Sequence, residues 1–157
     1  MHRYRTHRCG ELTKGDVASV ARLSGWVHRK RDHGQLLFID LRDHTGLTQI
    51  VFQPERSIFR DAEALRLESV VTVGKVVGRP PETINAELAT GEIELVAESM
   101  EVQGMADTLP LQVNAERDYP EETRLTYRFL DLRREKMQRQ IRLRSAVTAS
   151  IRRRMTE

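Results

Sequence analysis

The sequence has few of the features that mark secreted, membrane or disulfide-bonded proteins. Its 157 residues include one cysteine, Cys9, so no internal disulfide can form and a reducing compartment is favoured. No apolar run approaches the roughly 20 residues that a membrane-spanning helix needs. The basic start MHRYRTHRCG has no apolar segment behind it, unlike a signal peptide. These absences predict a cytoplasmic protein that does not insert into a membrane.

Motifs of catalysis and metal binding are also missing. The sequence contains no Cys-x-x-Cys or His-x3-His spacing, and His28, His33 and His44 do not form a metal-binding pattern. It has neither a glycine-rich phosphate loop nor a Gly-x-Ser-x-Gly segment. We therefore predict no catalytic residue, no metal site and no cofactor within this chain.

Charge is distributed unevenly, although the net charge is only +3. Residues 1–33 carry eight Lys/Arg against three Asp/Glu, residues 34–123 seven against seventeen, and residues 124–157 eleven against three. The acidic middle argues against a surface that attracts polyanions everywhere. A local basic patch remains possible at Arg29-Lys30-Arg31, for which a solvated sheet edge is the alternative interpretation.

Hydrophobic alternation predicts a domain dominated by β-strands over residues 1–104. The expected elements are strands over 20–27, 35–41, 47–52, 70–77 and 92–102, with a helix over 57–67 between the third and fourth strands. The first strand is expected to end at the basic run, and Ser57 to cap the helix. This order is typical of the OB-fold, a five-stranded Greek-key barrel that binds oligonucleotides or oligosaccharides. An SH3-like barrel or a small α+β sheet fits the same pattern.

The pattern changes after residue 104. Residues 105–134 contain few apolar repeats and are predicted to form a linker or hinge, which ends in the ordered segment RLTYRFLDLRR. Residues 135–157 have helical spacing, and several of their apolar side chains fall near one stripe: Met137, Ile141, Val147, Ile151 and Met155. Such a stripe indicates that the helix packs against a further domain or a second chain.

One face of the predicted sheet carries side chains suited to RNA. Phe38 is expected to point outward, close to Arg29 and Arg31, and single-stranded RNA is read by stacking bases on aromatic rings while basic residues follow the phosphates. The Gln49 amide suits a base edge, and the outward carboxylate of Glu94 can accept two N–H bonds from guanine. In the alternative interpretation, Phe38 packs beneath a loop and the polar residues merely face solvent.

Three segments, GWVHRKRDHGQLLFIDLRDHTGLTQIVF, ATGEIEL and LTYRFLDLRR, resemble in this order the N-terminal part of bacterial aspartyl-tRNA synthetases. The resemblance implies an anticodon-binding OB-fold domain over 1–104, a hinge over 105–134, and over 135–157 the first helix of a class II catalytic domain, at its dimer-forming motif. It implies that the full-length enzyme is a homodimer that uses ATP and Mg²⁺ to attach aspartate to tRNA. The family's ATP- and aspartate-binding motifs would lie beyond residue 157.

The resemblance also implies roles for individual residues. Phe38 corresponds to the residue that stacks on the central uridine of the anticodon, and Gln49 to the reader of its edge. Arg29 and Arg31 correspond to arginines that contact the anticodon loop. Glu94 corresponds to the carboxylate that reads the first anticodon base, guanine or its modified form.

The third anticodon base distinguishes the aspartate tRNA from the asparagine tRNA. The resemblance implies that Arg79 and Asn85 lie in the loop that closes over this base, and that His33 and Thr83 bear on the discrimination. In the family, His rather than Leu at the position of His33 accompanies enzymes that aspartylate both tRNA(Asp) and tRNA(Asn). We therefore predict a non-discriminating ligase, with a discriminating one as the alternative.

Two functions from other classes remain open. A general single-strand-binding module would tolerate any sequence and show steep salt dependence, which the acidic middle argues against. A protein-interaction OB domain would use its terminal helix to pair with a partner and would not bind RNA.

Overall fold

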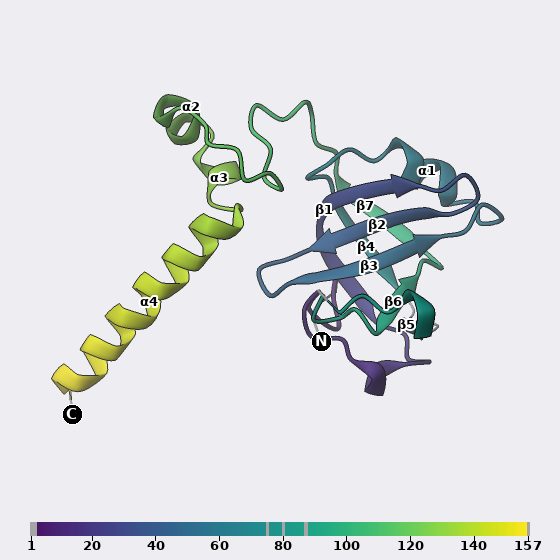
Figure 1. The fold of residues 1–157 in the computed structure, drawn as a ribbon, viewed down its shortest axis with the longest axis horizontal. Helices are drawn as coiled ribbons and strands as arrows, with labels where there is room; N and C mark the ends of the chain where they lie inside the picture. The colour runs from purple at the N-terminus through teal and green to yellow at the C-terminus, as the bar shows by residue number, and fades with distance from the viewer. Residues whose placement is uncertain (1–2, 75, 80, 87, 157) are drawn as a thin grey trace. The chain divides into compact units, whose positions relative to one another are not determined.

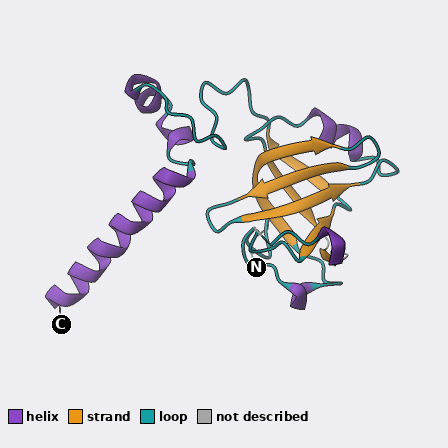
Figure 2. Ribbon diagram, viewed as in Figure 1, coloured by secondary structure: helices purple, strands orange, loops and turns teal. Residues whose placement is uncertain are grey.

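The computed structural model describes residues 3–74, 76–79, 81–86 and 88–156. The chain divides into two compact units, Met1–Thr108 and Leu109–Glu157, whose elements are drawn in Figures 1 and 2. The expected boundary between residues 104 and 105 stays a prediction.

In chain order the first unit forms η1 (Lys14–Asp16), β1 (Arg22–Asp32), β2 (Leu37–Arg42), β3 (Leu47–Phe52), α1 (Phe59–Ala64), β4 (Val70–Gly74), β5 (Val76–Gly78), η2 (Pro81–Thr83), β6 (Ile93–Val96) and β7 (Met100–Gly104). The second unit forms α2 (Glu121–Thr126), α3 (Arg128–Asp131) and α4 (Glu135–Thr156).

The strands of the first unit form one sheet in the order β5-β6-β3-β2-β1-β4-β7. The first three strands are antiparallel neighbours. As expected, the helix lies between β3 and β4. Figure 1 shows β1, β2 and β3 side by side across the front of the sheet. The strand-dominated character is therefore confirmed, whereas the expected number of five strands is wrong.

The extra strands arise because two expected strands are each divided. β6 pairs with β3 and β5 near one end of the sheet order, while β7 pairs with β4 at the other end. A single straight strand over 92–102 cannot serve both ends, so the chain breaks between Val96 and Met100. The expected strand over 70–77 is divided in the same way, with β4 beside β1 and β5 beside β6. Residue 75 lies outside the described residues.

The basic run does not end the first strand, as the sequence had suggested, but belongs to it. A β-bulge lies between Val27 and Arg29, and such an extra residue shifts the alternation of everything after it. Arg29 therefore stands opposite Asp40, whereas Lys30 stands opposite Ile39, which is fully buried in the core. The bulge thus places Arg29 and Arg31 on the outer face with Asp40 and Phe38, and Lys30 on the inner face with Ile39.

The helix α1 is shorter than predicted and is not capped by Ser57. Ile58 occupies the N-cap position and makes no side-chain cap hydrogen bond. At the other end, the Lys30 ammonium donates hydrogen bonds to the backbone oxygens of Glu63 at 2.7 Å and Leu65 at 2.9 Å. Because the last carbonyls of a helix lack intrahelical partners, a cation there stabilises it.

The core of the first unit lies on the inner face of the sheet. Alternate residues of β1, β2 and β3 point into it, which leaves the intervening residues on the outer face. Its largest fully buried side chains include Phe52, Leu12, Leu23, Leu37, Ile39, Leu41, Ile50, Leu65, Ile93 and Leu95.

The second unit has a small core and one buried carboxylate. Leu111, Val113 and Leu130 pack together, and Asp131 is fully buried. Its carboxylate accepts hydrogen bonds from Arg124 at 3.2 Å and from Arg128 at 2.8 Å. The guanidinium of Arg134 lies within ion-pair distance of it, at 3.6 Å. The terminal helix α4 follows, and four side chains of its predicted apolar stripe, Ile141, Val147, Ile151 and Met155, are exposed within this unit.

Candidate nucleic-acid interface

Strand pairing aligns four polar residues across the outer face of the sheet. Arg29 on β1 stands opposite Asp40 on β2, which stands opposite Gln49 on β3. Glu94 on β6 continues the row, since the Gln49 Nε2 donates a hydrogen bond to its Oε2 at 3.4 Å. These residues come from four strands but lie together because each side chain is directed away from the core.

An aromatic residue lies beside this polar row. Phe38 is paired with Arg31 on one side and Val51 on the other, and it is partly exposed. The His33 ring lies edge-on to the Phe38 ring, with centroids 5.4 Å apart and an interplanar angle of 87°. The face therefore presents an aromatic ring flanked by an arginine and an imidazole.

The polar side chains form a connected hydrogen-bond network. The Nη2 of Arg31 donates to Asp40 Oδ1 at 2.7 Å and to Gln49 Oε1 at 3.3 Å. Beyond Gln49, the Glu94 carboxylate lies 3.9 Å from the Nε of Arg79. Cations and carboxylates thus alternate along the face, with one neutral amide between them.

Glu94 is an acceptor in a partly desolvated position. Its side chain is 21 % exposed, and burial raises the pKa of its carboxyl above the ordinary value, although the charge of Arg79 and the hydrogen bond from Gln49 act in the opposite direction. A partly dehydrated carboxylate gains more from new N–H donors than a fully hydrated one does.

The buried side chain of Arg79 connects two backbone segments at the edge of the site. Its side chain is only 4 % exposed. The Nε donates to the Ile93 carbonyl at 2.9 Å and the Nη1 to the Thr83 carbonyl at 3.2 Å. Its buried Nη2 has no hydrogen-bond partner among the residues that the structure describes. Arg79 thus ties the loop after β5 to β6.

The loop predicted to close over the third base is compact in its described part. The Asn85 N–H donates to the Gly91 carbonyl at 3.1 Å, and the Gly91 N–H to the Leu88 carbonyl at 2.9 Å. A Cβ on Gly91 would lie 1.7 Å from the Asn85 oxygen, so this close approach requires glycine. Thr83 precedes this turn and is exposed.

The structure therefore brings together most of the residues singled out by sequence. Arg29, Arg31, His33, Phe38, Gln49 and Glu94 share one surface, while Arg79, Thr83 and Asn85 belong to the adjoining loop and its anchor. Sequence reasoning missed Asp40, which is 7 % exposed. The alternation of β2 places it on the face of Phe38, and that signal could have identified it.

A second polar cluster lies further along the outer face of β1 and β2. Arg42 donates two hydrogen bonds to the Glu68 carboxylate, at 2.8 and 3.0 Å, and lies over the Trp26 ring at 5.8 Å. Its Nη1 is 2.9 Å from His28 Nδ1. Since arginine only donates, His28 must accept there. Burial and the charges of Arg42 and Arg29 lower the pKa of His28 to about 4.

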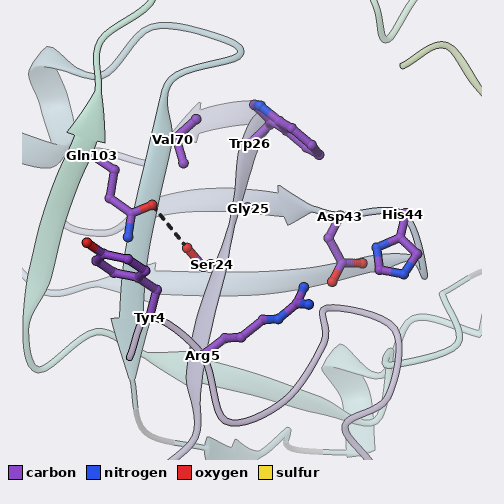
Figure 3. Close-up of a pocket in the computed structure, with 9 residues that line it drawn as sticks. All are labelled: Tyr4, Arg5, Ser24, Gly25, Trp26, Asp43, His44, Val70 and Gln103. Atoms are coloured by element: carbon purple, nitrogen blue, oxygen red, sulfur yellow. Dashed lines mark hydrogen bonds between the residues drawn. The ribbon is translucent and has the colours of Figure 1, made fainter. Parts of the chain in front are cut away.

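A recess of about 250 Å³ lies beside the first half of β1 (Figure 3). The two aromatic residues of its lining are Tyr4 and Trp26, and Ser24 donates a hydrogen bond to Gln103 across it at 3.4 Å. Its remaining lining residues are Arg5, Gly25, Asp43, His44 and Val70. This recess includes none of the residues that the sequence predicted for RNA binding.

The described part of the chain has neither a cluster of metal ligands nor a membrane-spanning helix. No group of three or more His, Cys, Asp or Glu residues there is arranged to hold a metal ion. No described helix is both long and apolar enough to cross a bilayer.

The fold and this face define an OB-type nucleic-acid-binding domain. Residues 21–103 match the family described as OB-fold nucleic acid binding domain, and the chain belongs to that family. Residues 120–157 match the family of class II tRNA synthetases D, K and N.

More specific similarity is found to aspartate–tRNA(Asp/Asn) ligases. The chain is 62 % identical over 157 residues to the ligase of Acidiphilium cryptum and 60 % identical over 158 residues to that of Zymomonas mobilis. These matches cover 99 % and 100 % of this chain but 26 % of each relative. The resemblance to bacterial aspartyl-tRNA synthetases is therefore confirmed.

A solved structure agrees with the fold. The aspartyl-tRNA synthetase of Entamoeba histolytica superposes with a TM-score of 0.81 at 20 % identity, over 93 % of this chain and 36 % of that chain. The chain thus spans about a quarter of the curated relatives' length and about a third of this structural neighbour.

Proposed function

We propose that this chain binds the anticodon loop of tRNA as the anticodon-binding domain of an aspartate–tRNA ligase. The observation that carries the proposal is the joint placement of the Phe38 ring and the Arg29–Asp40–Gln49–Glu94 row on one outer face. Single-stranded RNA needs a stacking platform, edge readers and cations for phosphate on one surface. All three are present here.

Each proposed contact follows from the chemistry of the side chain. Phe38 stacks on the central base, and Gln49 offers a donor and an acceptor to that base's edge. Glu94 accepts two N–H bonds from a guanine at the first position. Arg29 and Arg31 lie on the same face, where they neutralise phosphates. Two carboxylates on an RNA-binding face lower non-specific attraction and therefore favour the sequence-reading function over a general single-strand binder.

The activity of the whole protein is likewise a proposal. The relatives are named aspartate–tRNA(Asp/Asn) ligases, and we infer that the full-length protein attaches aspartate to tRNA(Asp) and tRNA(Asn) with ATP and Mg²⁺. The described residues of this chain do not fit a Mg²⁺–ATP site, since they contain no suitable acidic cluster. The proposed enzyme is a cytoplasmic homodimer, and the exposed apolar residues of α4 support a seam there.

The proposal that both tRNAs are substrates is supported by the position of His33. Its exposed ring contacts Phe38, so it lies beside the ring on which the central base would stack. A side chain at this point is close enough to influence the neighbouring third base, in which the two anticodons differ.

The test is the affinity of the 157-residue chain for three RNA stem-loops at one fixed salt concentration. Two carry the anticodons GUC and GUU, and the third an unrelated loop. We expect tight binding to the first two and weak binding to the third. Phe38→Ala should weaken binding to GUC by roughly 1–3 kcal/mol, the usual value of one stacked base. The matched control is Phe129→Ala, which removes an exposed ring in the other unit.

Each alternative gives a different result. Equal affinity for all three loops would indicate a sequence-tolerant single-strand binder, and preference for GUC over GUU a discriminating ligase. Absence of RNA binding, together with dimerisation of the chain, would indicate a protein-interaction domain. An unchanged affinity after Phe38→Ala would refute the stacking role.

A further inference from the structure

The side-chain amide of Gln49 is held in one orientation by groups of opposite hydrogen-bonding character. Its Oε1 faces the Arg31 Nη2 at 3.3 Å, and its Nε2 faces the Glu94 Oε2 at 3.4 Å. A guanidinium only donates and a carboxylate only accepts. Exchanging the oxygen and nitrogen of this amide would therefore break both hydrogen bonds, so the usual ambiguity of an amide does not arise here.

Asp40 fixes the donor that sets this orientation. The same Nη2 of Arg31 that donates to Gln49 also donates to Asp40 Oδ1 at 2.7 Å. The Asp40 side chain is 10 % exposed and that of Arg31 is 40 % exposed, so the carboxylate lies beneath the guanidinium. A charge-assisted bond of this length anchors the outer part of a long, flexible side chain. Without it, Arg31 could turn away from Gln49.

The orientation matters because uracil and cytosine present opposite patterns at the edge that an amide reads. An amide carries two donor hydrogens and two acceptor positions, so after the bonds to Arg31 and Glu94 one donor and one acceptor remain for a ligand. Uracil offers the O4 acceptor beside an N3–H donor. Cytosine offers an N4–H donor beside the N3 acceptor. For a ring stacked at one place, reversing the amide exchanges the preferred base.

We propose that Asp40, acting through Arg31 and together with Glu94, fixes the amide of Gln49 so that the site selects uracil over cytosine at the central anticodon position. Asp40 is a positioning residue in this account, because it acts on the base only through its neighbours. The proposal rests on the proposed function, from which it takes the central base as the ligand of Gln49. It explains why a carboxylate lies on a surface that must attract phosphate.

The experiment compares two stem-loops that differ only at the central position, GUC and GCC, with the 157-residue chain and its variants. The measured quantity is the ratio of the two affinities, which a general loss of stability or of positive charge does not change. Wild type should prefer GUC. Asp40→Asn keeps the shape but weakens the anchor of Arg31, and should reduce the ratio about tenfold, within the range for one bidentate contact to a base edge.

The matched control is Arg29→Met. Arg29 stands opposite Asp40 in the same row, but within the described part of the chain its side chain makes no hydrogen bond to Asp40 or Gln49. Its loss should weaken binding to both loops equally and leave the ratio unchanged, as expected for a phosphate contact. If Asp40→Asn does not fold, Arg31→Met takes its place, since it removes the donor itself from a partly exposed position.

The outcomes separate the two proposals. The positioning role would be overturned if the wild type preferred GUC and Asp40→Asn, or Arg31→Met in its place, kept the same preference. The anticodon-binding function would still stand in that case. An equal fall in the ratio after Arg29→Met would also overturn the positioning role, because any loss of charge would then suffice. Absence of any GUC preference in the wild type would overturn both.

Discussion

Replacement of Lys30 by methionine should affect folding rather than RNA binding. Lys30 lies in the middle of the basic run, which the sequence alone presents as one possible basic patch with Arg29 and Arg31. In the structure the bulge after Val27 turns it toward α1, where its ammonium donates to the carbonyls of Glu63 and Leu65. Lys30→Met therefore removes a helix C-terminal contact and keeps the apolar stem.

The expected cost follows from the number and exposure of these bonds. A cation at an exposed helix C-terminus contributes about 0.3–1 kcal/mol, and the second, part-buried bond to Leu65 adds a similar amount. The sum of about 0.6–2 kcal/mol should lower Tm by at least about 2 °C in a domain of this size. The affinity for the GUC stem-loop and its salt dependence should not change.

Thermal unfolding and RNA titration over a range of salt concentrations measure the two effects separately. Arg29→Met is the control with the opposite expectation: Tm is nearly unchanged, while the slope of log affinity against log salt falls by about 0.7 for one lost phosphate contact. If Lys30→Met reduced this slope as much as Arg29→Met and left Tm unaltered, the assignment of the two cations to opposite faces would be wrong.

Two further predictions concern pH and the loop. The pKa of His28 in the folded protein, about 4, lies below its ordinary value of 6.5. As the pH drops from 6.5 to 4, the unfolded chain therefore takes up the proton before the folded one does, and the folded state loses stability. The expected loss is about 2 kcal/mol after a discount for the partial exposure of the ring. Urea unfolding at pH 7 and pH 4.5 should show a smaller fall for His28→Gln, and an equal fall would contradict the assignment. Gly91→Ala forces a Cβ to within 1.7 Å of the Asn85 oxygen and should weaken binding to GUC and GUU about tenfold, roughly the loss of one base contact. An unaltered titration would show that this turn does not contribute.

Some of the fold could be predicted because it depends on signals that are close together in the sequence. The third strand was predicted with the bounds that the structure has, Leu47–Phe52, since its apolar and β-branched residues lie between a turn that ends at Gly46 and the strand breaker Pro54. The helix between β3 and β4 was also placed correctly, although it is shorter. The divided strands were not predictable, since each break depends on which distant strand pairs with each half.

The site shows the same division between local and distant information. Alternation along β2 puts Phe38 and Asp40 on one face, as their strand pairing confirms, although only Phe38 was singled out from the sequence. The bulge between Val27 and Arg29 was not visible, because each residue there fits a regular strand equally well. The burial of Arg79 and the orientation of the Gln49 amide depend on contacts with β6, more than ten residues away along the chain.

The buried carboxylate of the second unit makes that segment unequally tolerant of mutation. Three guanidinium groups converge on Asp131, and two of them are partly exposed, with side-chain exposures of 35 % for Arg124 and 43 % for Arg128. Loss of either arginine leaves the carboxylate with other partners. Loss of the carboxylate leaves three like charges crowded together, which is far more costly than losing one member of the group. Substitutions can therefore accumulate at Arg124 or Arg128 one at a time, whereas a change at Asp131 requires simultaneous changes around it.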